Sequence, residues 1–404
     1  MRLPWARSAS RRAFTTALVV VTGLVATTSG AHADPRGRDS VSCAEVTEST
    51  VNDWIRRANG GAAVLRKVNT GTRGCTVPVG PTGLEPLSGR LTLTAVGANL
   101  TLHGGDSVFD VRNGGVLTIN RLTLSGATSS AVVNNYGGTV FVNSSTITGN
   151  HAFFGGGLVN SGGTMTINDT TITGNTSQGQ GGGLGNSGST GFLVVTNSRI
   201  TRNNGLYGGG LINAGATTYV IGSEISENTS DGAAAGVVNS AGSLSVIGST
   251  VSRNTVLRCP GPSLCGGGFT NAGNLTILRS VVSGHNESAI GNLGGGALQV
   301  TNSKVEDNSA PGPGAGVISA LGGVVTIKDS EFTRNRSDAS GGAVANTGGG
   351  VITLERSRIT GNSAALGGGG LANLGNGMVT VTTGSVVTGN APDDCTGVVE
   401  GCQS

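Results

Sequence analysis

The sequence predicts an all-β protein: a right-handed, single-stranded parallel β-helix of about 11 or 12 coils with a short helical cap at its N-terminal end. A block of about 26 residues recurs from Ala131 to Asn390, and each copy carries three aliphatic positions. In stretches such as Thr164-Met165-Thr166-Ile167 the apolar residues alternate with Ser or Thr, so one face of each strand points inward. Three short strands per coil at this period are typical of a parallel β-helix, and two strands per coil are the alternative.

Two columns of asparagine and one of serine mark the turns between these strands. Asn tolerates left-handed backbone, and stacked amides hydrogen-bond to the turns above and below. We therefore interpret all three columns as structural ladders. The column that closes each copy is Asn150, Asn175, Asn203, Asn228, Asn254, Asn286, Asn308, Asn335, Asn362 and Asn390, and the second runs from Asn134 to Asn373.

Other repeat folds fit these residue types poorly. A helical repeat needs Ala, Leu, Glu and Lys at helical spacing, whereas this chain contains 73 Gly and is rich in Thr, Ser, Asn and Val. A propeller blade needs about 40 residues or more, which exceeds the period found here. The β-helix remains the prediction.

Residues 1–33 are expected to be a signal peptide, with arginines followed by an apolar run and the small-residue site Ala31-His32-Ala33. The segment around Arg11 and Arg12 also fits twin-arginine export, so both export routes stay open. Removing four Arg and no acid changes the formal charge from +3 to −1, which leaves no electrostatic basis for nucleic-acid binding. We expect no transmembrane segment, because no later stretch is long and apolar enough.

The mature chain is expected to start at Asp34 and to form one rod with a cap at each end. We assign residues 34–88 to an N-terminal cap region with a helix over Val46 to Ala58, 89–390 to the β-helix, and 391–404 to a C-terminal disulfide cap. Six cysteines in an exported chain favour disulfides, although six allow fifteen pairings. Their positions group as Cys43 with Cys75, Cys259 with Cys265, and Cys395 with Cys402.

Two recurring motifs resemble a known family. They are the GGA type, as in Gly341-Gly342-Ala343-Val344, and the F/I-x-x-N type, as in Phe332 to Asn335. They resemble the repeats of chlamydial polymorphic outer-membrane proteins and, more widely, of bacterial right-handed β-helix proteins with the pectin-lyase-like fold. The resemblance covers roughly residues 90 to 390 and implies secretion with a surface or adhesive role. This chain departs from the chlamydial proteins in lacking a C-terminal membrane barrel.

Catalytic and metal-binding motifs are weakly represented. The nearest pieces of a polygalacturonase-like site, Gly284-His285-Asn286 and Asp393-Asp394, lie about four coils apart and cannot form one acid/base site. We find neither the acidic calcium ligands nor the arginine motif of pectate lyases. His103 and His151 have no partners at metal-binding spacing, so we expect no metal and no cofactor.

One column of charged residues is a stronger candidate for a functional surface. The residue before the closing Asn is Gly in the outer copies but charged in the middle ones, beside the longest insertion, Thr255 to Cys265, which contains Arg258. Braced loops on a rigid scaffold often carry function. We hypothesise a recognition patch for an acidic or neutral glycan; the alternative is an exposed salt-bridge ladder. The column is Arg202, Glu227, Arg253, His285, Asp307 and Arg334.

Aromatic residues at the turns give a second hypothesis. Phe153, Phe154 and Tyr207 fall at equivalent places on neighbouring coils, where they can stack on sugar rings or tuck against the next loop. Ice binding is disfavoured, because the array that starts at Thr146-Ile147-Thr148 is broken by charged residues such as Arg199.

These observations favour a secreted, non-catalytic β-helix scaffold, extracellular or at the cell surface, that binds glycan or protein and supports adhesion. The alternative is a polysaccharide lyase or glycoside hydrolase of pectin-lyase-like fold. We expect a monomer whose partner is a polysaccharide or a cell-surface protein.

Overall fold

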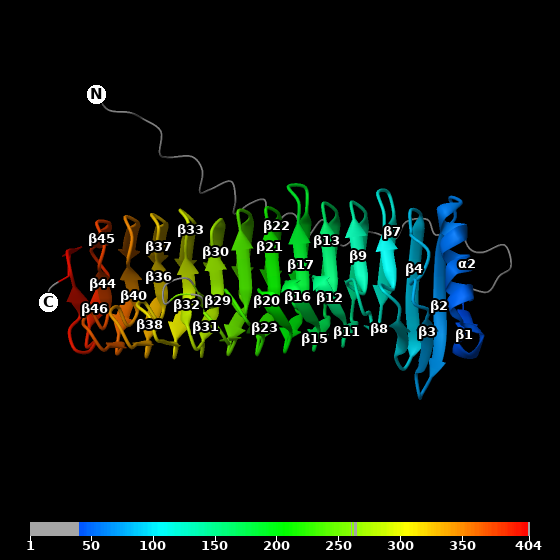
Figure 1. Cartoon of the computed structure of the whole chain (residues 1–404), viewed down its shortest axis with the longest axis horizontal. Helices are drawn as coiled ribbons and strands as arrows, with labels where there is room; N and C mark the ends of the chain where they lie inside the picture. The colour runs from blue at the N-terminus through cyan, green and yellow to red at the C-terminus, as the bar shows by residue number, and fades with distance from the viewer. Residues whose placement is uncertain (1–39, 260, 262–264, 403–404) are drawn as a thin grey trace, which may run out of the picture.

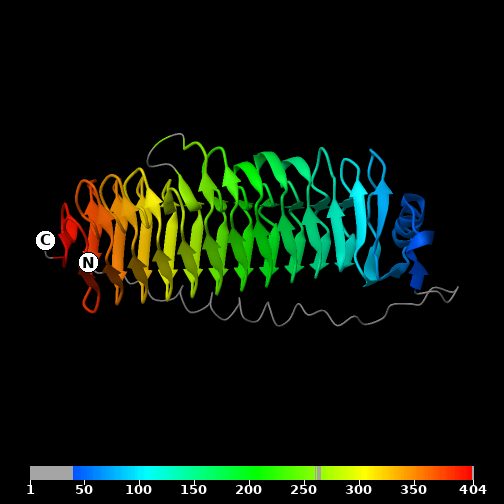
Figure 2. The ribbon, with the colours of Figure 1, turned by 90° about the horizontal axis from the view of Figure 1, so that it is seen from below.

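The computed structural model describes residues 40–259, 261 and 265–402; the expected signal peptide lies outside them. The chain forms an all-β parallel solenoid of about 14 turns with one α-helix near the N-terminal end. Figure 1 shows a straight rod with α2 at one end and the last strands at the other, and Figure 2 shows the same stack from below. Successive strands of every sheet are parallel and lie one coil apart, which establishes the predicted fold class.

Sheet A, the longest, has 15 strands within the described ranges. Its strands are β1 (Ser40–Ser42), β2 (Ala63–Gly71), β4 (Arg90–Gly97), β7 (Val116–Asn120), β10 (Thr139–Asn143), β14 (Thr164–Asn168), β18 (Phe192–Thr196), β22 (Thr217–Ile221), β26 (Ser243–Ile247), β30 (Asn274–Leu278), β33 (Ala297–Thr301), β37 (Val324–Lys328), β41 (Val351–Glu355), β45 (Met378–Val381) and β48 (Val399–Glu400).

Sheets B and C form the other two long walls of the rod. Sheet B contains β3 (Cys75–Val79), β5 (Leu100–Gly104), β8 (Leu122–Ser125), β11 (Thr146–Thr148), β15 (Thr171–Thr173), β19 (Arg199–Thr201), β23 (Glu224–Ser226), β27 (Thr250–Ser252), β31 (Val281–Ser283), β34 (Lys304–Glu306), β38 (Glu331–Thr333), β42 (Arg358–Thr360) and β46 (Val386–Thr388). Sheet C contains β6 (Phe109–Val111), β9 (Val133–Tyr136), β13 (Leu158–Ser161), β17 (Leu184–Ser187), β21 (Leu211–Ala214), β25 (Val237–Ser240), β29 (Gly266–Asn271), β32 (Ser288–Asn292), β36 (Val317–Ser319), β40 (Val344–Asn346), β44 (Leu371–Asn373) and β47 (Cys395–Thr396).

Two short side sheets lie between sheets B and C along the chain. Sheet D contains β12 (His151–Phe154), β16 (Thr176–Gln180), β20 (Asn204–Tyr207), β24 (Thr229–Ser230) and β28 (Thr255–Val256). Sheet E contains β35 (Ser309–Ala310), β39 (Arg336–Ser337) and β43 (Ser363–Ala364). No side strand is assigned in the coil between β28 and β35, so the side wall is interrupted there within the described part of the chain.

The core is a narrow column of stacked aliphatic side chains. In β14, Met165 and Ile167 are fully buried while Thr164 and Thr166 lie on the outer face, so the predicted alternation holds. Each typical coil contributes one strand to each of the three long sheets, which makes the two-strand alternative wrong. The coil count is higher than expected, because β2 and β3, within residues 34–88, already pair with β4 and β5.

The asparagine ladders are hydrogen-bonded as predicted, with two corrections in register. Through most of the closing ladder the Asn side-chain oxygen accepts from the backbone and side-chain amides of the Asn one coil before it, as Asn228 does from Asn203 at 2.9 and 3.0 Å. In one coil this place belongs to His285, not to Asn286. The second ladder begins at Asn135, which pairs with Asn160, and not at Asn134.

The N-terminal end is closed by helix α2 (Glu48–Asn59), which follows the short 3-10 helix η1 (Cys43–Glu45). Thr47 caps the N-terminus of α2, and Ile55, a residue of this helix, is fully buried. The described cysteines form the disulfides Cys43–Cys75, Cys259–Cys265 and Cys395–Cys402, the same pairs that the sequence groups. No helix in the described ranges is long and apolar enough to span a bilayer.

Candidate functional site

The charged column occupies a corner of the solenoid with left-handed backbone. Arg202, Glu227, Arg253, Asp307 and Arg334 have φ values of 51° to 57°. Glycine holds the equivalent corner in the outer coils, with φ of 64° at Gly149 and Gly174, because it adopts this conformation without strain. The structure therefore places five of the six predicted residues at one repeated position, immediately before the closing ladder.

Neighbouring members of this column are ion-paired. The carboxylate of Glu227 accepts hydrogen bonds from Arg202 at 2.9 Å and from Arg253 at 3.2 Å. Arg334 donates two bonds to Asp307, at 2.7 and 2.9 Å, and one to Glu306 at 3.0 Å. The bonds from Arg202 and Arg253 lower the pKa of Glu227, and the bond from Arg334 lowers that of Asp307. The arrangement matches the salt-bridge ladder weighed above, and a binding role for these residues stays a prediction.

His285 is not part of this surface, which corrects the sequence prediction. It is 2% exposed and stands in the closing ladder, so the corner of its coil is Gly284, with φ of 70°. The error came from aligning Asn286 with the ladder, which moved His285 one place outward. The charged column is therefore split into two groups, one on each side of Gly284.

The inserted segment Thr255 to Cys265 leaves the rod between sheets D and C, and residues 260 and 262–264 lie outside the described residues. Arg258 is exposed, and the Cys259–Cys265 disulfide closes the segment at its base. No hydrogen bond or ion pair joins Arg258 to the charged column among the residues that the structure describes. Arg258 and the column are therefore separate features.

The aromatic residues follow the side sheet rather than one ladder. In register, Phe154 of β12 pairs with Gln180 of β16, which pairs with Tyr207 of β20. Phe153 is 71% exposed and Tyr207 is 38% exposed. The ring of Phe154 lies against Gly185 of sheet C. A Cβ atom added to Gly185 would lie only 2.5 Å from the Cε1 atom of Phe154. Glycine at position 185 therefore allows this ring to pack closely against β17.

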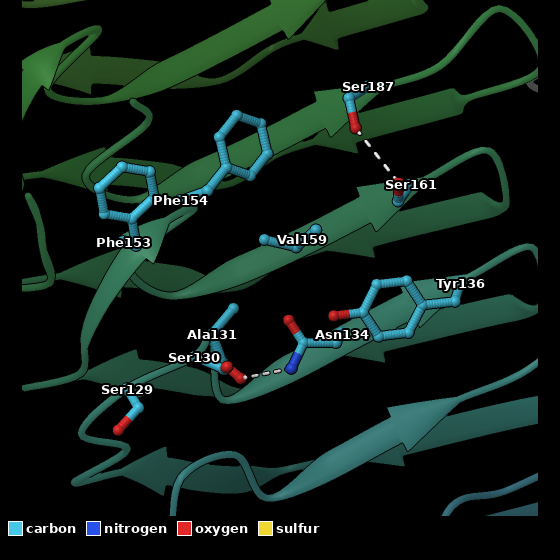
Figure 3. Close-up of a pocket in the computed structure, with 10 residues that line it drawn as sticks. All are labelled: Ser129, Ser130, Ala131, Asn134, Tyr136, Phe153, Phe154, Val159, Ser161 and Ser187. Carbon is cyan, nitrogen blue, oxygen red and sulfur yellow. Dashed lines mark hydrogen bonds between the residues drawn. The ribbon is translucent and has the colours of Figure 1, made fainter. Parts of the chain in front are cut away.

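A groove of about 240 Å³ lies along the outer face of sheet C, between the side sheet and the next turns. Its floor comes from three successive strands, because Tyr136 of β9, Ser161 of β13 and Ser187 of β17 are register partners. Figure 3 shows Phe153 and Phe154 along one side, Tyr136 along the other and Val159 between them. The remaining lining residues are Ser129, Ser130, Ala131 and Asn134.

One end of the groove is held by a polar cluster that sequence reasoning missed. The Asn134 side chain donates to Asp110 at 3.0 Å and to the carbonyl of Ala131 at 3.1 Å. Arg112 pairs with Asp110 at 3.4 Å and lies 5.0 Å from the centre of the Tyr136 ring. Burial, followed by the negative charge of Asp110, raises the pKa of the Tyr136 hydroxyl. In the sequence, the Asn134-Asn135 doublet could have indicated this cluster, because only one of the two residues can belong to the ladder.

The groove offers stacking faces and neutral hydrogen-bonding groups. Its ten lining side chains include three aromatic rings, four serine hydroxyls and one amide, and none carries a charge. The nearby Asp110 and Arg112 neutralise each other. Among the described residues, no group of three His, Cys, Asp or Glu side chains is placed to hold a metal ion. Such a surface suits polyhydroxylated ligands, which present apolar ring faces and hydroxyl edges.

No known family model matches the chain, and no curated protein matches it. Among solved structures, the chain is similar to the crystal structure of pectate lyase Pel9A, with 15% sequence identity and a TM-score of 0.36 over 70% of this chain and 72% of that chain. This likeness is too weak to support a functional conclusion. The parallel solenoid is established by the strand pairing described above.

Proposed function

We propose that this chain is an extracellular, non-catalytic β-solenoid that binds a neutral glycan in the groove on sheet C. The observation that carries the proposal is the uncharged lining, which combines aromatic rings with hydroxyl and amide groups. Its three disulfides favour an oxidising compartment, and the expected signal peptide would deliver it there. The GGA and F/I-x-x-N repeats add the resemblance to surface proteins.

The groove fits a chain-like ligand laid along the rod. Its floor spans three coils, and coils in parallel sheets are about 4.8 Å apart, so the floor is about 10 Å long. Phe153 presents an open ring, whereas Phe154 is packed on Gly185. We assign stacking to Phe153 and Tyr136, and hydrogen bonding to Asn134, Ser161 and Ser187.

Replacing Phe153 by Ala tests the stacking assignment. Loss of one exposed ring should weaken glycan binding by about two- to tenfold without changing the fold, since such contacts contribute about 0.5–1.5 kcal/mol. We would measure binding of the chain from Asp34 to a panel of soluble neutral polysaccharides by affinity electrophoresis. Leu366→Ala is the matched control, because Leu366 is 76% exposed and lies far along the rod.

The same incubations separate binding from catalysis. Retention without release of reducing or unsaturated ends supports the scaffold, and retention that is equal in wild type and Phe153→Ala removes the groove from consideration. Release of ends would overturn the non-catalytic proposal in favour of a lyase or hydrolase. Failure to bind any glycan would overturn the choice of ligand.

A further inference from the structure

One coil in the middle of the rod differs from all its neighbours in length. The closing ladder and the second column are 17 positions apart from Asn254 to Asn271, then 7 from His285 to Asn292, and then 11 from Asn308 to Ser319. The short coil has no room for a side strand, and this is why β28 ends sheet D and β35 begins sheet E. His285 and Glu287 both belong to this short coil.

His285 replaces asparagine in the buried ladder and must be neutral there. Its Nδ1 lies 3.1 Å from the backbone nitrogen and 3.2 Å from the carbonyl oxygen of Asn254, and its Nε2 lies 3.2 Å from the carbonyl of Val251. With a proton on Nε2 alone, Nδ1 accepts from the Asn254 N–H and Nε2 donates to Val251. Burial lowers the pKa of the imidazole to about 4, against the smaller opposing effect of its bonds to Asn254 and Val251.

Glu287 is a second buried ionisable group, and it has no partner among the described residues. It is 8% exposed and stands two residues after the ladder, where the flanking coils have Val256 and Ala310. No hydrogen bond or ion pair to its carboxyl is found within the described ranges. Burial alone raises the pKa of this carboxyl to about 7.

We propose that His285 and Glu287 form an opposing pair of buried ionisable side chains, which gives the stability of their short coil two pH dependences of opposite sign between mildly acidic and neutral pH. Each side chain is stable in its site only when uncharged. Opening of the coil lets the imidazole gain a proton in acid and lets the carboxyl lose one as the pH rises. The two effects have opposite slopes, so each offsets the other while both residues are present.

Charged groups on the adjoining segments leave this balance intact. The preceding coil carries Arg253 and Arg258, and the following coil carries Glu306 and Asp307. Arg253 is paired with Glu227, and Glu306 and Asp307 are both paired with Arg334. Burial is the whole cause of the Glu287 shift and the largest cause of the His285 shift.

The signs follow from proton linkage. Glu287 has a raised pKa when folded, so the folded coil holds an extra proton between pH 4.5 and 7, and its contribution to stability falls as the pH rises. His285 has a lowered pKa when folded, so the open coil holds the extra proton between about pH 4 and 6.5, and its contribution falls as the pH drops.

Two single variants expose the two slopes. His285→Asn restores the ladder residue of the other coils, and Glu287→Ala restores the residue at position 310. Between pH 5 and pH 7 the opening constant of the coil should rise by about forty-fold in His285→Asn and fall by about twenty-fold in Glu287→Ala. In the wild type the opening constant should change less than in either variant.

Hydrogen exchange of the full mature chain, read by mass spectrometry on peptides from 281–319 and corrected for intrinsic rates, measures these constants. His285→Gln and Glu287→Gln keep side-chain size and should show the same slopes if either first variant fails to fold. Glu400→Gln, which removes an exposed carboxyl far from this coil, should leave the wild-type profile unchanged. Slopes of the same sign in the two variants, or a wild-type slope as steep as that of either variant, would overturn the proposal.

Discussion

Left-handed corners are the most demanding single positions in this rod. Sixteen non-glycine residues of the described chain have positive φ, and most of them are Arg, Asp, Glu or Asn. Several pair across coils, as Arg356 does with Asp329 at 2.7 and 2.9 Å. A left-handed conformation strains an L-residue by about 1–2 kcal/mol, and surface ion pairs recover only part of this strain.

Leu321 also has a left-handed backbone, but its side chain cannot form an ion pair that would offset the strain. Its φ is 61°, and the residue is 68% exposed. Replacing it by Gly should raise the free energy of unfolding by up to about 1 kcal/mol, because relief of strain exceeds the added freedom of the unfolded chain. Urea denaturation measures the change. Leu366→Gly is the control at ordinary φ and should lower stability instead; a loss of stability in both variants would refute the argument.

At this scale the sequence identified residue types well and their register less well. Asn286 and Asn134 each sit next to a residue that competes for the same ladder place. His285 can accept and donate through its ring as an amide does, and Asn135 is chemically identical to Asn134. One-residue shifts of this kind reverse which side chain is buried, so only packing decides between them.

The ladders are the elements that tie one coil to the next. Asn228 donates to the carbonyl of Ile200 and to Asn254, both at 2.9 Å, and accepts two bonds from Asn203. Because the site is fully buried, removing the amide leaves backbone groups without partners. The ladder is therefore as important to the turns as the aliphatic column is to the core.

Asn228→Ala should lower the free energy of unfolding by about 2–5 kcal/mol, since several buried hydrogen-bonding groups lose their partners together. The urea midpoint gives the comparison. Asn376→Ala is the matched control, because Asn376 is exposed in a turn. A similar, small change in both variants would show that water replaces the amide without difficulty.

The strands themselves were predictable from alternation of apolar and hydroxyl residues, and the groove was not. Its wall comes from β12, while its floor comes from β9, β13 and β17, which precede and follow that strand in the chain. Phe153 and Phe154 could be named from their place in the repeat. The polar end at Asp110 and Arg112 could not, because it lies before the regular copies begin.

The whole molecule is a stack whose ends are closed by different devices. At the N-terminal end α2 covers the first coils, and Cys43–Cys75 fastens the chain ahead of the helix to β3. At the other end Cys395–Cys402 joins the residues around β47 and β48. The coil count was underestimated from the sequence because β2, with nine residues, and β3 lack the Asn and Gly landmarks of the regular copies.

Removal of single disulfides should rank them by the length of chain that they close. Cys43 and Cys75 are separated by 32 residues, and Cys259 and Cys265 by 6. Serine replacement of both partners should lower the free energy of unfolding by about 4 kcal/mol for the first pair and about 2 kcal/mol for the second. Urea midpoints of the two double variants under non-reducing conditions test this order, and the reverse order would contradict it.

The interrupted side wall also gives the rod a mechanical weak point. Backbone hydrogen bonds between coils run along the rod, so a pull on its two ends stretches the bonds of every sheet at each boundary together. Most boundaries from β12 onward share that tension among three long sheets and a side sheet. At the coil of His285 only the long sheets carry it, and we expect a stretched molecule to part there before any other boundary between β12 and β43.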